Sequence, residues 1–587
     1  MRISKAPFAK GYPSGERFLY SVERRDRRIY FSALRNGDEE NFFGAVISSS
    51  AIEERLTLNN LVESASGRAT VEVSVQGVTN LPHQVSVGMN GSQIGQLGFN
   101  GQSKGQQRFE VPHSLLLEGQ NIITLQSANG PSDISLVESI RITYQHTYRA
   151  ENDWLGFTAK PGETATVSGF SSKDIRVFDV TDESNVQELE VSIEQTKDSY
   201  AATVTIRGAS LAAPSLTDRK LLALTDEKAL QPLAVKDNSP SQLRDATNGA
   251  HYIIISKSDL VDSLRPLAAL RTKQGLKTAL VDIEDIYDEF SFGDKSPQSI
   301  RDFLSYASMS WKLRPLFVLL AGDASYDARN YLGLGDNDLV PTKLIDTAYL
   351  ETASDDWFAD FDDDGVANLS LGRLPVRSAS DASLFVNKLI TYEQSAPSNE
   401  MTLAADITDG FNFEQASTAL RSLIPSSIRL TEVFRSRSDD PDSRNQLLAA
   451  INRGQKIVNY AGHGSVNVLR GNLLEASDSS LFTNRDRLSL FVMMTCLNGY
   501  FQDAMNDSLG ESLLKSETGG AVAVWASSGL TLPGDQAVLN QELYGLLFNR
   551  LPGITIGEAV MRAKLSVGDS DIRRTWILLG DPAMKLR

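Results

Sequence analysis

The sequence predicts an α/β domain with a mostly parallel sheet covered by helices, preceded by β-sandwich modules. Three observations lead to this prediction. The chain has 587 residues, whereas one hydrophobic core rarely organises more than about 250 to 300. In the first part of the chain, short alternating apolar runs are separated by turn residues, which is typical of antiparallel sheets. Beyond residue 250, apolar strands alternate with longer amphipathic helices, which is typical of parallel sheets.

The amino-terminal part is predicted to form an antiparallel β-sandwich over residues 1–148, with strands such as ATVEVSVQGV and NIITLQS. The turn dipeptides between its strands are typical of tight hairpins: Asn36-Gly37, Asn90-Gly91 and Asn100-Gly101. A second β-rich module with a linker is predicted over residues 149–235. Both modules are interpreted as structural or binding units, because their histidines form no cluster with metal-ligand spacing. We expect these histidines at the surface or in loops: His83, His113 and His146.

A polar, turn-rich stretch over residues 225–249 separates the β-rich part from a predicted domain over residues 250–587. In that domain HYIIIS is predicted as a buried strand, followed by an amphipathic helix over 260–274 that Gly275 closes. KTALVDI is the next strand, and a second helix over 296–311 leads to the strand PLFVLLAG. This β-α-β alternation predicts a parallel sheet with helices on its faces.

The charge balance excludes some classes of partner. A net charge of -17 and an isoelectric point near 4.9 argue against binding to nucleic acid or to an anionic membrane. No window approaches 18 apolar residues, so we expect no membrane span. The first residues lack the apolar core of a signal peptide. The sequence does not indicate an oligomeric state.

The functional hypothesis centres on two short apolar runs, 456–460 and 488–495, which have the length of buried strands. The first leads to His463 and the second to Cys496, the sole cysteine of the chain. The chain between them is long enough for a crossover with a helical stretch near 477–487. The two strands can therefore be parallel neighbours that deliver both side chains to one edge of a sheet.

A thiol and an imidazole at one sheet edge form a nucleophile and its base. An adjacent imidazolium lowers the pKa of a thiol, and the same imidazole can later protonate a leaving amine. The backbone amides of Gly464 and Cys496 could together donate to an oxyanion. The alternative is that Cys496 is a small core residue and that His463 belongs to a turn.

At these residues the sequence resembles a known family. The pairing of NYAGHGS with a hydrophobic strand that ends in TCLNG is similar to the gingipain family of cysteine peptidases, peptidase family C25. The resemblance extends through the α/β part, including Gly322-Asp323 and the final LLGDPAMKLR. It implies a caspase-like fold for residues 250–587 and a location outside the cell or at its surface. It also implies that β-rich segments ahead of the catalytic domain can serve as pro-regions.

A D-x-D-x-D-G motif predicts a structural Ca²⁺ site at Asp360, Asp362 and Asp364. Alternating carboxylates can converge on one hard cation, and the glycine that follows permits a sharp turn. The motif departs from an EF-hand at Leu371, where the bidentate glutamate would stand. Mg²⁺ suits the motif less well because it keeps several waters, and a solvated acidic loop is the alternative. The resemblance supports calcium, since gingipain family members bind it as a structural ion.

The resemblance also implies an acidic residue that orients the histidine, in the loop after a strand at 402–405. Asp409 is the candidate and Asp406 the fallback, although either could instead cap the helix predicted over 414–423.

Substrate recognition is predicted from the same resemblance. A pocket for a basic side chain needs a buried acid, and in the corresponding segment, 411–417, this chain offers Glu414. The stretch VWASSGLTLPG resembles the substrate-lining strand of the family, where Trp525 is either a pocket wall or a core residue.

We therefore predict a cysteine endopeptidase that hydrolyses protein or peptide substrates through Cys496, His463 and a thioester acyl-enzyme, with cleavage after basic residues as the specificity hypothesis. Two alternatives stay open. An amine could take the acyl group in place of water, which would be transpeptidation. The chain could also be a catalytically silent caspase-fold protein that serves in adhesion or secretion.

Overall fold

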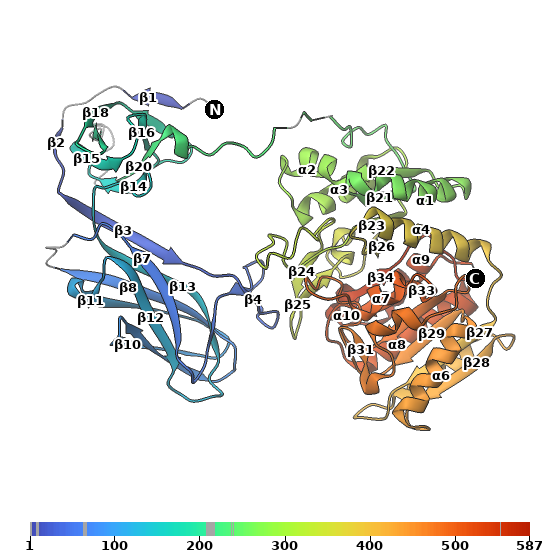
Figure 1. Cartoon of the computed structure of the whole chain (residues 1–587). Coiled ribbons are helices and arrows are strands. Elements are labelled where there is room, and N and C mark those ends of the chain that lie inside the picture. The colour runs from blue at the N-terminus through green and yellow to red at the C-terminus, as the bar shows by residue number, and fades with distance from the viewer. Residues whose placement is uncertain are drawn as a thin grey trace. The chain divides into compact units, whose positions relative to one another are not determined.

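The computed structural model describes residues 3–6, 11–62, 67–206, 218–235, 237–238, 240–551 and 553–587. The chain folds into two compact units, whose elements are labelled in Figure 1. Unit 1 comprises residues 1–31 and 41–237, and unit 2 comprises residues 32–40 and 238–587. The finer division of the β-rich part into modules over 1–148 and 149–235 stays a prediction.

Part of unit 1 consists of two antiparallel sheets, with strand orders β10-β9-β12-β7 and β11-β8-β13-β3. Alternate residues of these strands, such as Val71, Val73 and Val85, form one buried apolar core. Asn90 and Gly91 both have positive φ, which makes β9 and β10 a tight hairpin. The strand bounds are β3 Arg17–Arg24, β4 Ile29–Tyr30, β5 Phe42–Phe43, β6 Val46–Ile47, β7 Ile52–Leu58, β8 Arg68–Gly77, β9 Pro82–Met89, β10 Ser92–Asn100, β11 Lys104–Pro112, β12 Gly119–Ser127 and β13 Ser135–Thr147.

The rest of unit 1 contains two further sheets, β1-β17-β16-β20-β14 and β18-β19-β15-β2, around a second apolar core. The first strands of the chain belong here, because β1 pairs with β17 and β2 with β15. The strand bounds are β1 Ser4–Ala6, β2 Tyr12–Pro13, β14 Trp154–Ala159, β15 Glu163–Phe170, β16 Ile175–Asp179, β17 Gln187–Leu189, β18 Val191–Gln195, β19 Tyr200–Thr205 and β20 Arg219–Thr225.

Two histidines of unit 1 are buried, so the expectation that they lie at the surface is wrong. Strand alternation turns them inward, and polar partners compensate for their burial. The His83 Nδ1 atom lies 2.5 Å from Asp133 Oδ1, and the His146 Nε2 atom lies 3.1 Å from Glu151 Oε1. His113, in a short 3₁₀ helix, is half-buried.

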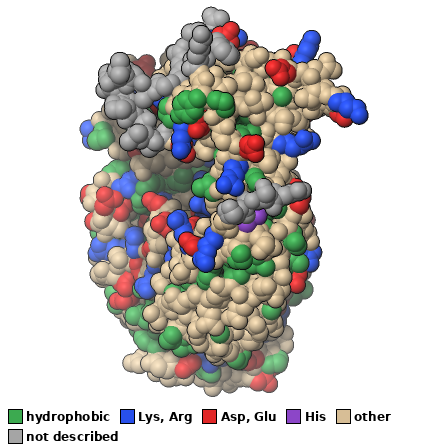
Figure 2. Space-filling view, turned by 90° about the vertical axis from the view of Figure 1, so that its left-hand side faces the viewer, with side chains coloured by type: hydrophobic (Ala, Val, Ile, Leu, Met, Phe, Trp, Pro, Cys, Tyr) green, Lys and Arg blue, Asp and Glu red, His purple; other side chains and the backbone are tan. Residues whose placement is uncertain are grey.

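Figure 2 shows one face of the molecule on which described acidic and basic side chains are interspersed. Ion pairs between strands of unit 1 likewise place opposite charges side by side, for example Arg68 and Glu110 at 2.9 Å. The excess negative charge is therefore not gathered into a single patch on this face.

Unit 2 is built on one sheet, in which ten described strands follow the order β22-β21-β23-β26-β34-β33-β32-β29-β27-β28. Neighbours pair in parallel throughout, except β33 and β34, which are antiparallel. The predicted mostly parallel sheet is therefore confirmed. The strand bounds are β21 Tyr252–Ser256, β22 Thr278–Asp282, β23 Phe317–Ala321, β26 Ser370–Leu374, β27 Glu400–Ala405, β28 Arg429–Phe434, β29 Ile457–Ala461, β32 Ser489–Met494, β33 Ala521–Ser527 and β34 Trp576–Leu579. Two two-stranded sheets complete the described strands of unit 2: β24 Lys343–Asp346 with β25 Glu351–Ser354, and β30 Gly464–Ser465 with β31 Val468–Leu469.

Helices cover both faces of this sheet. In β21, Tyr252 and Ile254 pack into the core that includes α1 and α4, while Ile253 and Ile255 pack against α2 and α3. The helices are α1 Val261–Lys273, α2 Ile283–Ser291, α3 Pro297–Ser310, α4 Ala379–Gln394, α5 Phe413–Ala419, α6 Asp440–Arg453, α7 Leu509–Lys515, α8 Pro533–Gly545, α9 Ile556–Ala563 and α10 Ser570–Thr575. None of the described helices has the length and apolarity needed to cross a membrane.

A segment from the amino-terminal part of the chain, residues 32–40, belongs to unit 2. The Ser32 carbonyl accepts from the Glu351 amide at 2.7 Å, and the Gly37 amide donates to Asp346 Oδ2 at 2.8 Å. The Tyr331 hydroxyl donates to Glu40 Oε1 at 2.5 Å. The sequence pattern places this segment with the first sandwich, so its assignment to unit 2 differs from the predicted domain boundaries.

Candidate active site

The two strands that carry the predicted nucleophile and base are hydrogen-bonded neighbours. β29 and β32 pair in parallel, and Ala461 at the end of β29 stands opposite Met494 at the end of β32. His463 and Cys496 each follow two residues later, so both leave the sheet at the same edge and in the same register. The connection between them is less helical than predicted, because a 3₁₀ helix over Ala476–Leu481 replaces the helix expected near 477–487.

The Cys496 side chain is half-buried, and its thiol donates to the Thr531 carbonyl oxygen at 3.6 Å. Burial raises the pKa of this thiol, and the bond to Thr531 offsets the effect only in part. Within the described residues the thiol makes no hydrogen bond to His463. The pKa of the thiol therefore lies above its ordinary value, which differs from the lowered pKa expected from an adjacent imidazolium.

The turn after Cys496 is held in an unusual conformation. Leu497 has φ of 61°, in the left-handed region that a leucine rarely adopts, and its amide donates to the Gly529 carbonyl at 3.1 Å. The Cys496 amide itself donates to no group in the described part of the chain, so it is available to an oxyanion. The Asn498-Gly499 pair signals a turn in the sequence, but the strained residue is the leucine before it.

The glycines around His463 allow neighbouring protein to approach closely. A Cβ atom at Gly464 would lie 2.5 Å from Thr495 Oγ1 and 2.9 Å from Asn498 Oδ1. Asn498 then ties the two loops together, because its side-chain amide donates to the Ser465 carbonyl at 2.5 Å. Gly464, the other predicted oxyanion donor, begins the short hairpin of β30 and β31.

The His463 ring is about half exposed and lies edge-to-face with Phe413, at 5.2 Å between ring centroids. Its backbone is fixed on both sides. The amide donates to Asp406 Oδ2 at 3.2 Å, and the carbonyl accepts from the Tyr460 hydroxyl at 2.9 Å. Asp406 is buried and is paired with Arg435. The fallback residue thus positions the main chain of His463 rather than its imidazole.

Asp409 is the carboxylate that faces the imidazole. Its Oδ2 atom lies 3.9 Å from His463 Nε2 and 2.8 Å from Arg470 Nη1. Arg470 therefore shares this carboxylate with the histidine. Sequence reasoning missed Arg470, which carries no motif of its own and reaches Asp409 only through the β30–β31 hairpin.

The two predicted substrate-binding residues have other partners in this structure. Glu414 is partly exposed, and hydrogen bonds from Ser436 and Arg437 lower the pKa of its carboxyl. Trp525 is wholly buried in β33, with its ring 5.3 Å from that of Trp576. The structure therefore favours the interpretation of Trp525 as a core residue. Glu414 already has a cationic partner, Arg437.

The predicted metal-binding carboxylates converge. One oxygen from each of Asp360, Asp362 and Asp364 lies within 4.8 Å of the others, which is about twice a Ca²⁺–oxygen distance. Asp360 is buried, and its two oxygens accept from the amides of Asp364 at 3.1 Å and Gly365 at 2.9 Å. Burial raises the pKa of Asp360, and the neighbouring carboxylates raise it further. The donor set fits a hard divalent cation that would offset this repulsion.

A mostly parallel sheet with helices on both faces, and with a cysteine and a histidine at the ends of adjacent strands, is the arrangement of a caspase-like domain. The model of peptidase family C25 matches residues 245–587, and the chain belongs to this family. The resemblance of the sequence to the gingipain family and the predicted caspase-like fold are both confirmed.

The relatives are distant. Gingipain R2 of Porphyromonas gingivalis is 20% identical over 369 residues, 58% of this chain and 46% of that protein. An uncharacterized protein of Archaeoglobus fulgidus is 24% identical over 270 residues, 41% of this chain and 62% of that protein. The chain thus spans less than two thirds of the length of either relative.

Two solved structures are similar to this chain, and the first is from Porphyromonas gingivalis. Dimeric latent PorU aligns with all of this chain and 54% of its own, with 15% identity and a TM-score of 0.55. The arginine-specific cysteine proteinase gingipain R aligns over 60% of this chain and 80% of its own, with 19% identity and a TM-score of 0.49. At this level of identity the likeness to PorU shows the fold alone.

The thiol chemistry gives a testable pH dependence. Because the pKa of Cys496 is raised, we expect its alkylation by iodoacetamide to rise about tenfold per pH unit from pH 6 to beyond pH 9. Cys496 is the sole cysteine, so the mass of the adduct reports this rate directly, with Cys496→Ala as the blank. A rate that is already high and flat between pH 5 and 7 would reveal a preformed thiolate–imidazolium pair.

Proposed function

We propose that this chain is a cysteine endopeptidase with Cys496 as nucleophile and His463 as general base and acid. The observation that carries the proposal is the shared register of β29 and β32, which brings both residues to one sheet edge. In the reaction the imidazole takes the thiol proton as sulfur bonds to the scissile carbonyl carbon. The oxyanion accepts from the amides of Gly464 and Cys496.

The protonated imidazole then gives its proton to the leaving amine, the C–N bond breaks, and a thioester remains on Cys496. Water attacks the thioester, His463 takes a proton from it, and the thiol is released with its proton restored. Asp409 supports this cycle as the carboxylate beside His463 Nε2. A thiol whose pKa is raised fits a mechanism in which proton transfer accompanies attack.

The experiment that tests the proposal is a screen of fluorogenic peptides with arginine, lysine or an apolar residue before the cleaved bond. Turnover that disappears after alkylation of Cys496 and in His463→Ala supports the proposal. Products joined to an added amine would indicate transpeptidation. No turnover under any condition, with an intact fold, would favour a catalytically silent protein.

Cleavage after basic residues is part of the proposal, supported by the excess negative charge of the chain. Glu414 contributes little to it, because Arg437 already neutralises its carboxylate. We expect Glu414→Gln to change the ratio of arginine to apolar cleavage by about twofold or less. The same ratio is measured in Asp409→Asn for comparison, since the Asp409 carboxylate lies beside the His463 imidazole. A large loss of arginine cleavage in Glu414→Gln alone would contradict this expectation.

We also propose that Asp360, Asp362 and Asp364 hold a structural Ca²⁺ ion. Because binding to the folded state alone stabilises it, Ca²⁺ at about 100 times its Kd should add about 2.7 kcal/mol. The measurement is thermal unfolding with Ca²⁺ and with a chelator. Asp362→Asn should remove the difference, whereas Asp363→Asn should keep most of it, because the Asp363 carboxylate pairs with Arg301. An equal Ca²⁺ response in both variants would exclude this site.

The proposed setting is outside the cell or at its surface, with proteins or peptides as substrates. Membership of a peptidase family supports the substrates, and the similarity to gingipain R2 supports the setting.

A further inference from the structure

Helix α7 follows directly on the loop that carries Cys496, and its first turn contacts both loops of the candidate site. The Leu509 amide donates to the Val466 carbonyl at 2.8 Å, and the Gly510 amide donates to the Asn498 carbonyl at 2.9 Å. Val466 lies just after His463, and Asn498 just after Cys496. The start of α7 therefore fixes the two loops relative to each other.

Glu511 holds this first turn in place. Its Oε2 atom accepts from the Ser508 amide at 2.8 Å and from the Ser508 hydroxyl at 2.9 Å, while the Glu511 amide donates back to that hydroxyl at 3.3 Å. Unlike most capping residues, Glu511 is completely buried. Its charge state therefore matters to the turn.

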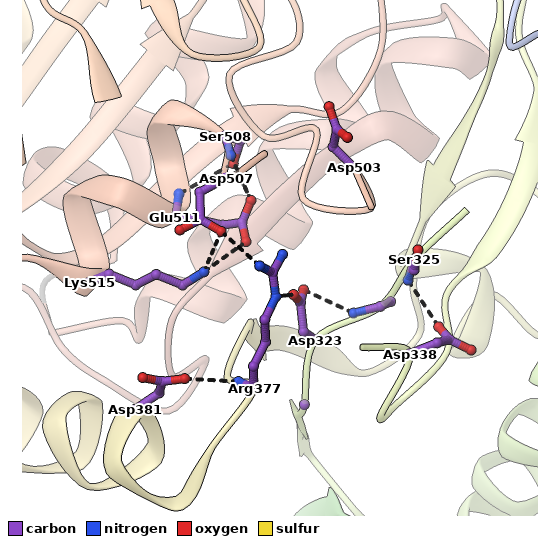
Figure 3. A network of polar contacts seen from close by, with 12 residues as sticks. Asp323, Ser325, Asp338, Arg377, Asp381, Asp503, Asp507, Ser508, Glu511 and Lys515 are labelled. Atoms are coloured by element: carbon purple, nitrogen blue, oxygen red, sulfur yellow. Dashed lines mark hydrogen bonds and ion pairs between the residues drawn. The ribbon is translucent and has the colours of Figure 1, made fainter. Parts of the chain in front are cut away.

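Glu511 belongs to a group of charges, shown in Figure 3 and called here the α7 cluster, in which Asp323 and Glu511 are buried and the others partly buried: Asp323, Arg377, Asp507, Glu511 and Lys515. Arg377 Nε lies 2.5 Å from Asp323 Oδ2, at the end of β23, and Arg377 Nη1 lies 3.4 Å from Asp507 Oδ1. Lys515 Nζ lies 2.7 Å from Asp507 Oδ1 and 3.4 Å from Glu511 Oε1.

The α7 cluster thus contains three carboxyl groups and two cations among the described residues. One negative charge is in excess if all are ionised, and burial makes this costly, so the cluster favours one bound proton. Burial raises the pKa of Asp323, and burial followed by the nearby Asp323 carboxylate raises that of Glu511 to about 8.

Two further charged groups face this region from α4. Asp381 accepts from the Arg377 amide at 3.1 Å. Lys388 donates to the last carbonyls of α7, at 2.6 Å to Leu514 and 3.0 Å to Ser516, and burial lowers its pKa to about 7. Both ends of α7 therefore contact an ionisable side chain whose pKa is shifted toward neutral pH by burial.

We propose that Glu511 is a positioning residue for the Cys496 and His463 loops, acting in its protonated form through the first turn of α7. When the proton leaves, Glu511 carries a charge beside Asp323 and Asp507, and the turn loosens. Asn498 and Val466 then lose their fixed partners, and the two loops lose their shared geometry. This inference rests on the proposed function for its effect on turnover, but its effect on α7 is independent of turnover.

The sign of the pH effect distinguishes Glu511 from Lys388. The pKa of Glu511 rises from 4.5 to about 8 on folding, so the folded state binds more protons and loses stability as pH rises through that window. The pKa of Lys388 falls from 10.5 to about 7, so its contribution to stability grows as pH rises through its own window. Of these two groups, Glu511 alone predicts loosening with rising pH.

The test uses Glu511→Gln, which keeps the capping bonds but has no proton to lose. Glu558→Gln is the matched control, because Glu558 forms the same capping box with Thr555 on α9, at 2.8 Å to its hydroxyl. We expect kcat to fall near pH 8 in the natural chain and in Glu558→Gln. In Glu511→Gln the fall in kcat should begin about one pH unit or more higher. KM should stay within about twofold. If kcat fell at the same alkaline pH in all three proteins, the proposal would be overturned.

The second measurement needs no turnover. Hydrogen exchange at the Leu509 and Gly510 amides is compared at pH 6.5 and pH 9 in a Cys496→Ser background. We expect protection at pH 9 to be about tenfold lower with Glu511 than with Gln at that position, and equal at pH 6.5. Equal protection at pH 9 would overturn the proposal. Absence of turnover in every variant would instead refute the peptidase, and exchange would still decide the role of Glu511.

Discussion

Replacing Cys496 with alanine should lower kcat for peptide hydrolysis by about 10⁶-fold, the scale seen when a peptidase nucleophile is removed. No other cysteine can substitute, because Cys496 is the sole one in the chain. The fold should persist, since the thiol makes one weak hydrogen bond, to Thr531 at 3.6 Å. We expect a stability change of about 1 kcal/mol or less. The measurement is turnover of the best fluorogenic peptide, with thermal unfolding in parallel.

Met505→Ala is the control for Cys496→Ala. Met505 lies on the same loop and is 68% exposed, so its replacement should leave turnover and stability nearly unchanged. If Cys496→Ala retained hydrolysis, the nucleophile would be assigned wrongly. If it unfolded the protein, Cys496 would be a core residue, which is the alternative that the sequence left open.

The largest expected loss of stability comes from Arg373→Met. Arg373 has no exposed surface, and its guanidinium pairs with Asp355 through two bonds, at 2.6 and 2.8 Å. It also donates to the carbonyls of Gly322 and Val340, each at 2.7 Å, and stacks over Phe501 at 4.8 Å. Removing it leaves Asp355 charged, buried and without its partner. We expect a loss of about 3 to 5 kcal/mol in the free energy of unfolding.

Denaturant unfolding followed by tryptophan fluorescence measures this loss, because four of the five tryptophans lie in unit 2. Arg429→Met is the control, since the Arg429 side chain is 72% exposed in its pair with Glu400 and should change stability by about 0.5 kcal/mol or less. Asp355→Asn in the Arg373→Met background should recover part of the loss. A loss in Arg373→Met no larger than that of the control would show that the ion pair is not needed.

The strands and helices around the site could be predicted because their signals are local. The helix Pro297–Ser310 begins with a serine cap and a proline, and the helix expected to close at Gly275 ends at Lys273, with Gly275 at positive φ two residues later. The helix predicted near 477–487 does not form, because serine and aspartate side chains there make local hydrogen bonds that favour the short 3₁₀ helix. The burial of His83 and His146 also escaped prediction. The partner of His83, Asp133, lies 50 residues along the chain, and Glu151, five residues after His146, forms no recognisable pattern with it.

At the site, the two parallel strands and the positions of His463 and Cys496 followed from short apolar runs with the right separation. The polar partners did not. Arg470, Arg435 and Asn498 reach the site from separate segments, and single residues of these types have no pattern of their own in a sequence. Leu497 could not be predicted for a different reason: a left-handed leucine contradicts its own propensity and is imposed by the surrounding structure.

The assignment of residues 32–40 to unit 2 has a consequence for dividing the gene into expressible parts. The family match begins at residue 245, yet the folded unit is discontinuous. It includes residues 32–40, called here the strap, which are encoded more than two hundred codons upstream. A fragment that starts at the family boundary would expose the surfaces that Ser32, Gly37 and Glu40 cover on the β24–β25 region. Supplying the strap in trans as a synthetic peptide would separate two roles of the amino-terminal half: completing the fold of unit 2 and acting through unit 1.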